Sequence, residues 1–286
     1  MTTLDVRISE LCGASVVAMA RVSGGDVSDA FRVTLSNGRV LFAKTKADAP
    51  EEFFSIEAEG LRWLDNAGVI GVAKVVGVAD GDPAFLALEW IEPGNARSAD
   101  AESRFGAELA ELHRVGVEAF GRPDSRPTGS LRLPNNPCET WAEFYADRRL
   151  RPLAQLAADR GVLETSTIDG LVQLADRLDE FGASDEPPAL LHGDLWSGNR
   201  LVDAEGRSWL IDPATHGGHR EFDLAMMRLF GGFAQQSFDA YDEAFPLADG
   251  WEQRVPLHHL APLTVHAIKF GGPYGAAVTA ALGQVS

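Results

Sequence analysis

The chain has little cysteine and fewer basic than acidic residues. Its two cysteines, Cys12 and Cys138, lie far apart and provide neither a disulfide framework nor a zinc-binding pattern. Lysine and arginine together number 25 against 42 aspartate and glutamate residues, which gives a formal net charge of −17 at pH 7. Nucleic acid and anionic membranes attract clustered positive charge, so neither is expected as a main partner. The negative charge is compatible with a cationic substrate.

Long apolar runs are also missing. No uninterrupted hydrophobic segment approaches the roughly 20 residues that span a bilayer. The first residues, Met-Thr-Thr-Leu-Asp-Val-Arg, lack the basic segment and apolar stretch of a signal peptide. We therefore expect a cytoplasmic protein without membrane contact, and a monomer is the default expectation. With 286 residues, 45% of them hydrophobic, the chain is long enough for two lobes with separate cores.

The most informative stretch runs from His192 to Asn199 and reads HGDLWSGN. Asp194 and Asn199 are separated by four residues, and Asp212 follows thirteen residues after Asn199. A kinase site needs a carboxylate to receive the proton of the acceptor hydroxyl, and an amide with a second carboxylate to hold Mg²⁺. The order Asp, Asn, Asp therefore predicts a phosphoryl-transfer site. The alternative for the first two residues is a β-turn, but the apolar runs before both aspartates favour the kinase interpretation.

The first 91 residues have the pattern of an antiparallel sheet with one helix. Several segments are rich in β-branched residues, and Asn37-Gly38 between two of them is a strong hairpin signal. A periodic apolar segment that stops at Gly68 predicts the helix. The predicted strands are 15–22, 30–35, 39–45, 73–78 and 84–91, and the helix is 50–68.

After a break at Pro93-Gly94-Asn95 the chain turns helical. The order of elements is that of the protein-kinase fold, an α+β fold with two lobes. We expect an N-lobe at 1–91, a linker at 92–97, and a mainly helical C-lobe at 98–286 with the catalytic loop and acceptor site. Helices are predicted at 98–116, at 140–160 with a kink near Pro152, at 166–181 and from 221 onward, with a loop at 117–138.

Lys44 lies on the third predicted strand, and Glu57 follows thirteen residues later in the helix. In kinases such a pair positions the nucleotide, because the lysine binds the phosphates and the glutamate orients the lysine. The alternative is a strand-edge lysine and a solvated helical glutamate. Glu59 is the rival for the partner role, although it would face another side of the helix.

Two further segments are expected to bind ATP through main-chain groups. The loop at 24–31 lies where kinases fold a glycine-rich loop over the phosphates, although it lacks the full Gly-x-Gly-x-x-Gly pattern and alone would be a hairpin turn. Residues at the end of the fifth strand lie where kinases bind adenine. The expected ATP contacts are Gly25, Asp26, Val27 and Ser28 in the loop and Glu89, Trp90 and Ile91 in the strand.

The histidines near these motifs have more ordinary interpretations. His192, two residues before Asp194, is expected to support the loop by hydrogen bonding. His216 and His219 leave a metal pair open, but hard Mg²⁺ prefers oxygen ligands, which Asn199 and Asp212 already supply.

Longer stretches of the chain resemble the fructosamine/ketosamine-3-kinase family. The resemblance covers nearly the whole chain and is strongest over residues 141–233. Aminoglycoside and choline phosphotransferases are broader relatives that share His-Gly-Asp and Ile-Asp but generally lack the Trp196 form of the loop. The matching stretches are HGDLWSGN at 192–199, IDPATHGGHREFDLA at 211–225, LFGGF at 229–233 and EFYADRRLRP at 143–152, with a less specific match around Gly24-Gly25 and Phe42-Ala-Lys44.

The resemblance implies phosphorylation, with ATP and Mg²⁺, of the O3 hydroxyl of a ketose attached to an amine, after which the adduct breaks down. Such an activity would repair glycated amines, and the substrate would be a small-molecule or protein-bound ketosamine. By position, Asp194 would be the catalytic base, Asn199 and Asp212 the Mg²⁺ ligands, and Lys44 with Glu57 the phosphate-binding pair.

Three residues are expected near the acceptor. Trp196, within the catalytic loop, could pack its indole against the sugar or could be a buried anchor of the loop. Glu221 and Asp223 could attract the cationic amine, or could cap the helix that follows them.

Two other functions stay open at this point. A phosphotransferase for an aminoglycoside or for a choline-like amino alcohol would suit the acidic chain equally well. A nucleotide-binding pseudokinase is the alternative of another class, but such a protein has no chemical reason to keep all five polar residues of the motif. These five are Lys44, Glu57, Asp194, Asn199 and Asp212.

Overall fold

The computed structural model describes residues 3–22, 28–94, 96–181 and 185–285. Contacts between residues divide the chain into two compact units. Unit 1 consists of residues 1–101 with 200–213, and unit 2 of residues 102–199 with 214–286. The lobe boundaries at 91 and 97 stay a prediction. None of the described helices is long and apolar enough to cross a membrane.

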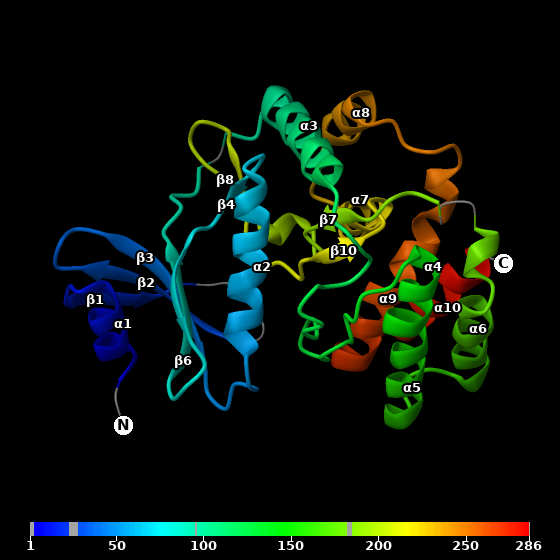
Figure 1. Cartoon of the computed structure of the whole chain (residues 1–286), viewed down its shortest axis with the longest axis horizontal. Helices are drawn as coiled ribbons and strands as arrows, with labels where there is room; N and C mark the ends of the chain where they lie inside the picture. Colours follow the sequence, from blue (N-terminus) through cyan, green and yellow to red (C-terminus); the bar gives the residue numbers. More distant parts are fainter. Residues whose placement is uncertain (1–2, 23–27, 95, 182–184, 286) are drawn as a thin grey trace. The chain divides into compact units, whose positions relative to one another are not determined.

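Unit 1 contains a five-stranded antiparallel sheet in the order β1-β2-β3-β6-β5 (Figure 1). The Asn37-Gly38 turn joins β2 to β3, as the hairpin signal predicts. Helix α2 packs beside β5 and β6. The predicted kinase-like α+β fold is thereby confirmed. The bounds are β1 Val16–Arg21, β2 Asp29–Leu35, β3 Val40–Lys46, α2 Phe53–Ala67, β5 Val75–Ala79 and β6 Ala84–Glu89.

The core of this sheet follows from alternation along its strands. Val33 and Leu35 on β2 are buried together with Leu41 and Ala43 on β3, because residues two apart in a strand point to the same face. Helix α1 (Leu4–Cys12), which the sequence does not predict, adds Ile8 to this core.

A second sheet of unit 1 joins segments far apart in the sequence. The two-residue strand β4 (Gly71–Val72) pairs in parallel with β9 (Ser208–Leu210), and β9 pairs antiparallel with β8 (Arg200–Val202). These pairings place the end of β9, and with it Asp212, in unit 1.

Unit 2 is mainly helical, as expected. A short antiparallel pair of β7 and β10 is the exception among its described residues. Helix α3 begins in unit 1 and continues into unit 2. The bounds are α3 Ala99–Val115, α4 Trp141–Tyr145, α5 Arg151–Arg160, α6 Thr165–Ala175, β7 Ala189–Leu191, β10 His216–Gly218, α7 Glu221–Leu229, α8 Gln235–Ala244, α9 Trp251–Phe270 and α10 Tyr274–Val285.

The predicted helix 140–160 is interrupted before Pro152. Helix α4 passes through one π-helical turn, Ala146–Leu150, into α5, and the proline occupies the first turn of α5. A proline has no N–H group to donate inside a continuous helix, and the wider π-helical turn directly before it, in which the N–H of Arg151 bonds to the carbonyl of Ala146, accommodates this break in the hydrogen bonding.

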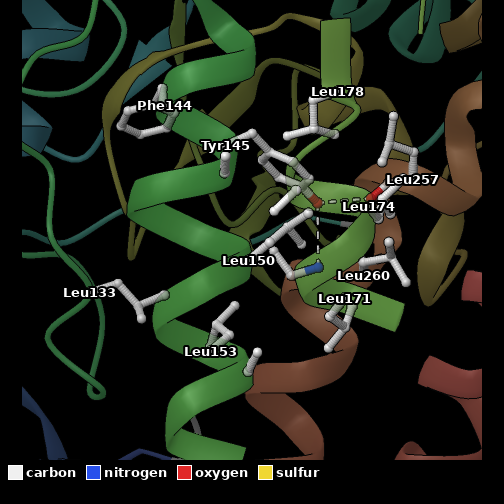
Figure 2. Close-up of a cluster of buried hydrophobic side chains, with 14 of the residues drawn as sticks. Leu133, Phe144, Tyr145, Leu150, Leu153, Leu171, Leu174, Leu178, Leu257 and Leu260 are labelled. Atoms are coloured by element: carbon white, nitrogen blue, oxygen red, sulfur yellow. Dashed lines mark hydrogen bonds between the residues drawn. The ribbon is translucent and has the colours of Figure 1, made fainter. Parts of the chain in front are cut away.

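Helix α9 contains prolines at 256 and 262. Between them, the hydroxyl of Tyr145 from α4 bonds to the main chain of α9 (Figure 2). Pro262 lacks the N–H group that would bond to the carbonyl of His258. The hydroxyl of Tyr145 lies 3.4 Å from that carbonyl and donates more closely, at 2.8 Å, to the carbonyl of Leu257. Around this polar contact, Leu150, Leu171 and Leu260 belong to the apolar core of unit 2.

Candidate active site

Unit 1 brings three of the predicted polar residues together. Lys44 on β3 is buried, and its Nζ lies 2.5 Å from Glu57 Oε1 and 2.7 Å from Asp212 Oδ1. Glu57 and not Glu59 therefore meets the lysine. Asp212 lies just after β9 in a left-handed conformation, with φ at 52°, which an aspartate tolerates better than most residues.

Lys44 and Glu57 each shift the pKa of the other. Burial alone would lower the pKa of Lys44, but the carboxylates of Glu57 and Asp212 outweigh burial and hold it above its usual value. Burial raises the pKa of Glu57 to about 7, against the opposing effect of the ammonium. The lysine is thus a fixed positive charge, suited to binding phosphate oxygens.

The other predicted ATP contacts fall in part outside the described residues. Gly25, Asp26 and Val27 lie there, while Ser28 is described and half-buried.

At the end of β6, the N–H groups of Glu89 and Trp90 are already used within unit 1. They donate to the carbonyls of Lys74 at 2.9 Å and of Val40 at 3.3 Å. An adenine contact at these two residues would therefore use their carbonyl oxygens. Together with Ile91 they stay predicted contacts.

The catalytic loop follows β7 in unit 2 and brings Asp194 and Asn199 together. The amide nitrogen of Asn199 donates to the main-chain oxygen of Asp194 at 2.8 Å and to its Oδ2 at 3.1 Å. Because the amide nitrogen faces the aspartate, the amide oxygen, the group that Mg²⁺ prefers, points away from it. Asn199 is thus fit to bind a hard cation, and Asp194 is fixed beside it.

A buried carboxylate accepts hydrogen bonds from the main chain of this loop. Asp223 on α7 accepts hydrogen bonds from the N–H of His192 at 2.7 Å and of Gly193 at 2.9 Å. His192 in turn accepts from the N–H of Asp194 at 3.2 Å, the supporting role expected for it. Asp223 also lies 3.3 Å from Nε2 of His113.

Asp223 is fully buried and engaged with these protein groups. Burial would raise the pKa of Asp223, but the contact with His113 and the hydrogen bonds lower it below its usual range. The side chain is therefore ionised and supports the loop.

Glu221, the other predicted acceptor residue, is also fully buried. Arg254 binds both of its oxygens, at 2.9 and 2.5 Å, and His258 lies 3.3 Å from one of them. Burial is outweighed by the hydrogen bonds from His258 and Arg254, which lower the pKa of Glu221 to about 2. His219, Glu221 and His258 offer ligand atoms within 4.8 Å of one another, but the guanidinium already neutralises the carboxylate.

The side chain of His216 is buried and contacts other protein groups. Its Nδ1 lies 2.8 Å from the carbonyl of Ala214, and its ring stacks on Phe144 with centroids 5.5 Å apart. Burial, with a contribution from the charge of Arg149, lowers the pKa of His216 to about 3. The imidazole is therefore neutral at physiological pH.

Trp196 lies at the end of a series of partly exposed aromatic side chains in unit 2, which we call the aromatic row. Its side chain is 40% exposed, so it is not a buried anchor of the loop. The other members, Phe230, His266, Phe270 and Tyr274, are not among the acceptor residues expected from the sequence. Ring centroids are 6.4 Å apart for Trp196–Phe230, 5.1 Å for Phe230–His266, 5.5 Å for His266–Phe270 and 5.0 Å for His266–Tyr274.

Comparison with known proteins agrees with the motif-based resemblance. The family model described as fructosamine kinase matches residues 2–286. The chain belongs to the fructosamine kinase family. A probable ketoamine kinase from Enterococcus faecium is 35% identical to this family member over 258 residues, 90% of this chain and 91% of the relative. The protein is accordingly a phosphotransferase of the ketoamine-kinase type.

Solved structures give the same family and a wider fold group. A "putative fructosamine-3-kinase" from Thermobifida fusca has a TM-score of 0.91 and 39% identity, over 99% of this chain and 98% of that one. APH(2")-IIa in a ternary complex with streptomycin and ATP has a TM-score of 0.65 at 16% identity, over 99% and 97%. Choline kinase LicA from Streptococcus pneumoniae has 0.63 at 16%, over 98% and 96%. At these low identities, the likeness of the fructosamine kinase to the last two proteins shows a common fold.

Proposed function

We propose that this fructosamine kinase transfers the γ-phosphoryl group of ATP to the O3 hydroxyl of a ketosamine, and that the reaction serves the repair of glycated amines. The observation that carries the proposal is the catalytic loop, in which Asn199 fixes Asp194 and Asp223 fixes the main chain beneath them. Asp194 receives the hydroxyl proton, or orients the hydroxyl for attack.

Asn199 and Asp212 are the proposed Mg²⁺ ligands. The chemistry of these residues fits, because each offers an oxygen donor, and Mg²⁺ neutralises phosphate charge when bound. Lys44 holds the phosphates, and Glu57 keeps its ammonium in place.

The aromatic row is the proposed acceptor surface. Trp196 lies two residues after Asp194, and its exposed indole can pack on the apolar face of a sugar. Aromatic faces also attract the cationic amine of a ketosamine. Glu221 and Asp223 are engaged within the protein, so we assign recognition of the amine to the aromatic row instead.

An aminoglycoside or choline-like acceptor is the second candidate. Its support is the shared fold of APH(2")-IIa and choline kinase LicA, a likeness that identifies no substrate for this chain.

The test is ADP release with Mg-ATP and three acceptors: ribulose-lysine, fructose-lysine and kanamycin. We expect turnover on a ketosamine and none on kanamycin. The Asp194→Ala variant should lose activity, and Asp194→Asn should lose about 10²–10⁴-fold because an amide accepts no proton. Turnover on kanamycin alone would favour the second candidate function. Near-normal activity of Asp194→Asn would refute the assignment of Asp194 as the base.

A further inference from the structure

The N-terminus of α2, the helix that carries Glu57, lacks a cap of its own. Its N-cap residue, Glu52, is in a left-handed conformation, and the Glu52 side chain makes no capping hydrogen bond. The first N–H groups of any helix need partners from outside it. Here the N–H of Phe53 bonds to the carbonyl of Pro50 at 3.1 Å, which leaves the next two groups to be satisfied.

Asp80, directly after β5, supplies both missing partners. Its Oδ1 accepts from the N–H of Phe54 at 3.2 Å and of Ser55 at 3.3 Å, and Ser55 Oγ donates to its other oxygen. A negative charge at this end of a helix is also favoured by the helix dipole. A carboxylate 25 residues away in sequence thus holds the first turn of α2 to the sheet.

Glu57 lies immediately after this first turn. Its contact with Lys44 is buried and short, 2.5 Å, so it requires the helix to begin in one position. A helix end that loses its cap frays over the first turn.

We propose that Asp80 is a positioning residue for nucleotide binding, which acts by fixing the first turn of α2 and thereby the Glu57–Lys44 contact. The inference rests on the proposed function of that pair. Asp80 itself touches neither Glu57 nor Lys44 through any hydrogen bond found among the described residues.

The experiment measures the Kd of the full chain for AMP-PNP with Mg²⁺ by titration calorimetry, which needs no acceptor. Asp80→Ala should weaken binding about fivefold, equivalent to about 1 kcal/mol and typical of a lost cap. Asp80→Asn keeps an oxygen acceptor for both N–H groups and should stay within about twofold of the wild type.

A matched control removes a cap elsewhere. Thr140 caps α4 in unit 2 by accepting from the N–H of Glu143 at 3.2 Å. Thr140→Ala should lower Tm by an amount similar to Asp80→Ala and leave the Kd unchanged. An unchanged Kd in Asp80→Ala, together with a lowered Tm, would overturn the inference and reduce Asp80 to a purely stabilising residue.

A double variant tests whether Asp80 acts on nucleotide binding through Glu57. Glu57→Gln should weaken nucleotide binding, and adding Asp80→Ala to it should weaken binding little further, because both act through one contact. Additive losses would overturn the inference while leaving the function of Glu57 intact. No effect of Glu57→Gln would instead refute the proposed role of the pair itself.

Discussion

At the scale of single residues, the buried carboxylate of Asp223 supports the main chain of the catalytic loop. It accepts two main-chain N–H groups, and an asparagine could accept with only one of its two polar atoms. Asp223→Asn should therefore destabilise the protein by about 2–3 kcal/mol, since one buried N–H would lose its acceptor and a charge would be removed.

Urea unfolding of Asp223→Asn at pH 7 measures this loss. Tyr241→Phe is a milder control, because it removes one hydroxyl, 2.8 Å from the imidazole of His113, and leaves the loop contacts in place. Equal unfolding midpoints for Asp223→Asn and the wild type would contradict the supporting role.

The neutral imidazole of His216 predicts a dependence of stability on pH. Its pKa is about 3 in the folded protein, against about 6.5 when unfolded, so the unfolded chain binds the extra proton as the pH falls. Stability from this group is complete above pH 6.5 and is lost progressively toward pH 3. Between pH 7 and pH 5 the loss should be about 2 kcal/mol.

The free energies of unfolding of the wild type and of His216→Asn, each measured at pH 7 and at pH 5, test this prediction. The asparagine can still donate to the carbonyl of Ala214 but does not titrate. The variant should be less stable throughout, yet lose about 2 kcal/mol less between pH 7 and pH 5. The same loss in both proteins would assign the acid sensitivity to other groups.

Part of the candidate site could be predicted at this scale, because the spacing of polar residues in the sequence indicates which of them meet in a kinase-like fold. The distance in sequence from Lys44 to a glutamate on the next helix predicts their contact, and the structure selects Glu57. The partners of Glu221 and Asp223 were not predictable, because Arg254 and His113 approach from helices distant in sequence. An acidic residue at a helix start has the same local pattern whether it faces a ligand or the protein interior.

At the scale of elements, close contact between α3 and α8 depends on one glycine. A Cβ at Gly106 would overlap the main-chain carbonyl of Ser237. Gly106→Ala should destabilise the protein by about 1–3 kcal/mol despite the better helix propensity of alanine, because neither backbone can move freely.

Gly283 on α10 is the matched control. It is exposed, and a Cβ there would meet no atom within 4 Å. Gly283→Ala should leave stability unchanged or raise it by about 0.5 kcal/mol. Thermal unfolding of the two variants side by side gives the comparison, and a neutral Gly106→Ala would contradict the close helix contact.

Elements with a strong local pattern were predictable, and those defined by distant partners were not. The five strands of the large sheet and α2 agree with the periodicity of their segments. Strands β4, β8 and β9 have two or three residues each, too few for a periodic signal, and exist because they pair with one another. Helix α9 continues past two prolines, and the bond that Tyr145 donates to its Leu257 carbonyl comes from a helix distant in sequence, which no local rule indicates.

At the scale of the whole molecule, nucleotide binding should be visible as added stability. A ligand that binds the folded state alone stabilises it by about 2.7 kcal/mol at a hundredfold excess over Kd. Mg-ATP should therefore raise Tm by several degrees, EDTA should reduce the shift, and Lys44→Met should remove most of it. A Tm unaffected by Mg-ATP would argue against the assigned nucleotide site.

The second sheet of unit 1 delays the folding of this unit during synthesis on the ribosome. Strands β8 and β9 belong to unit 1 but are encoded about 100 residues after the rest of it. On the ribosome, β4 has no partner, and Lys44 has only one of its two carboxylates, until residue 212 has emerged. Unit 1 therefore cannot complete its folding before most of unit 2 has been synthesised, and an expression fragment ending at the predicted linker would lack part of its own sheet.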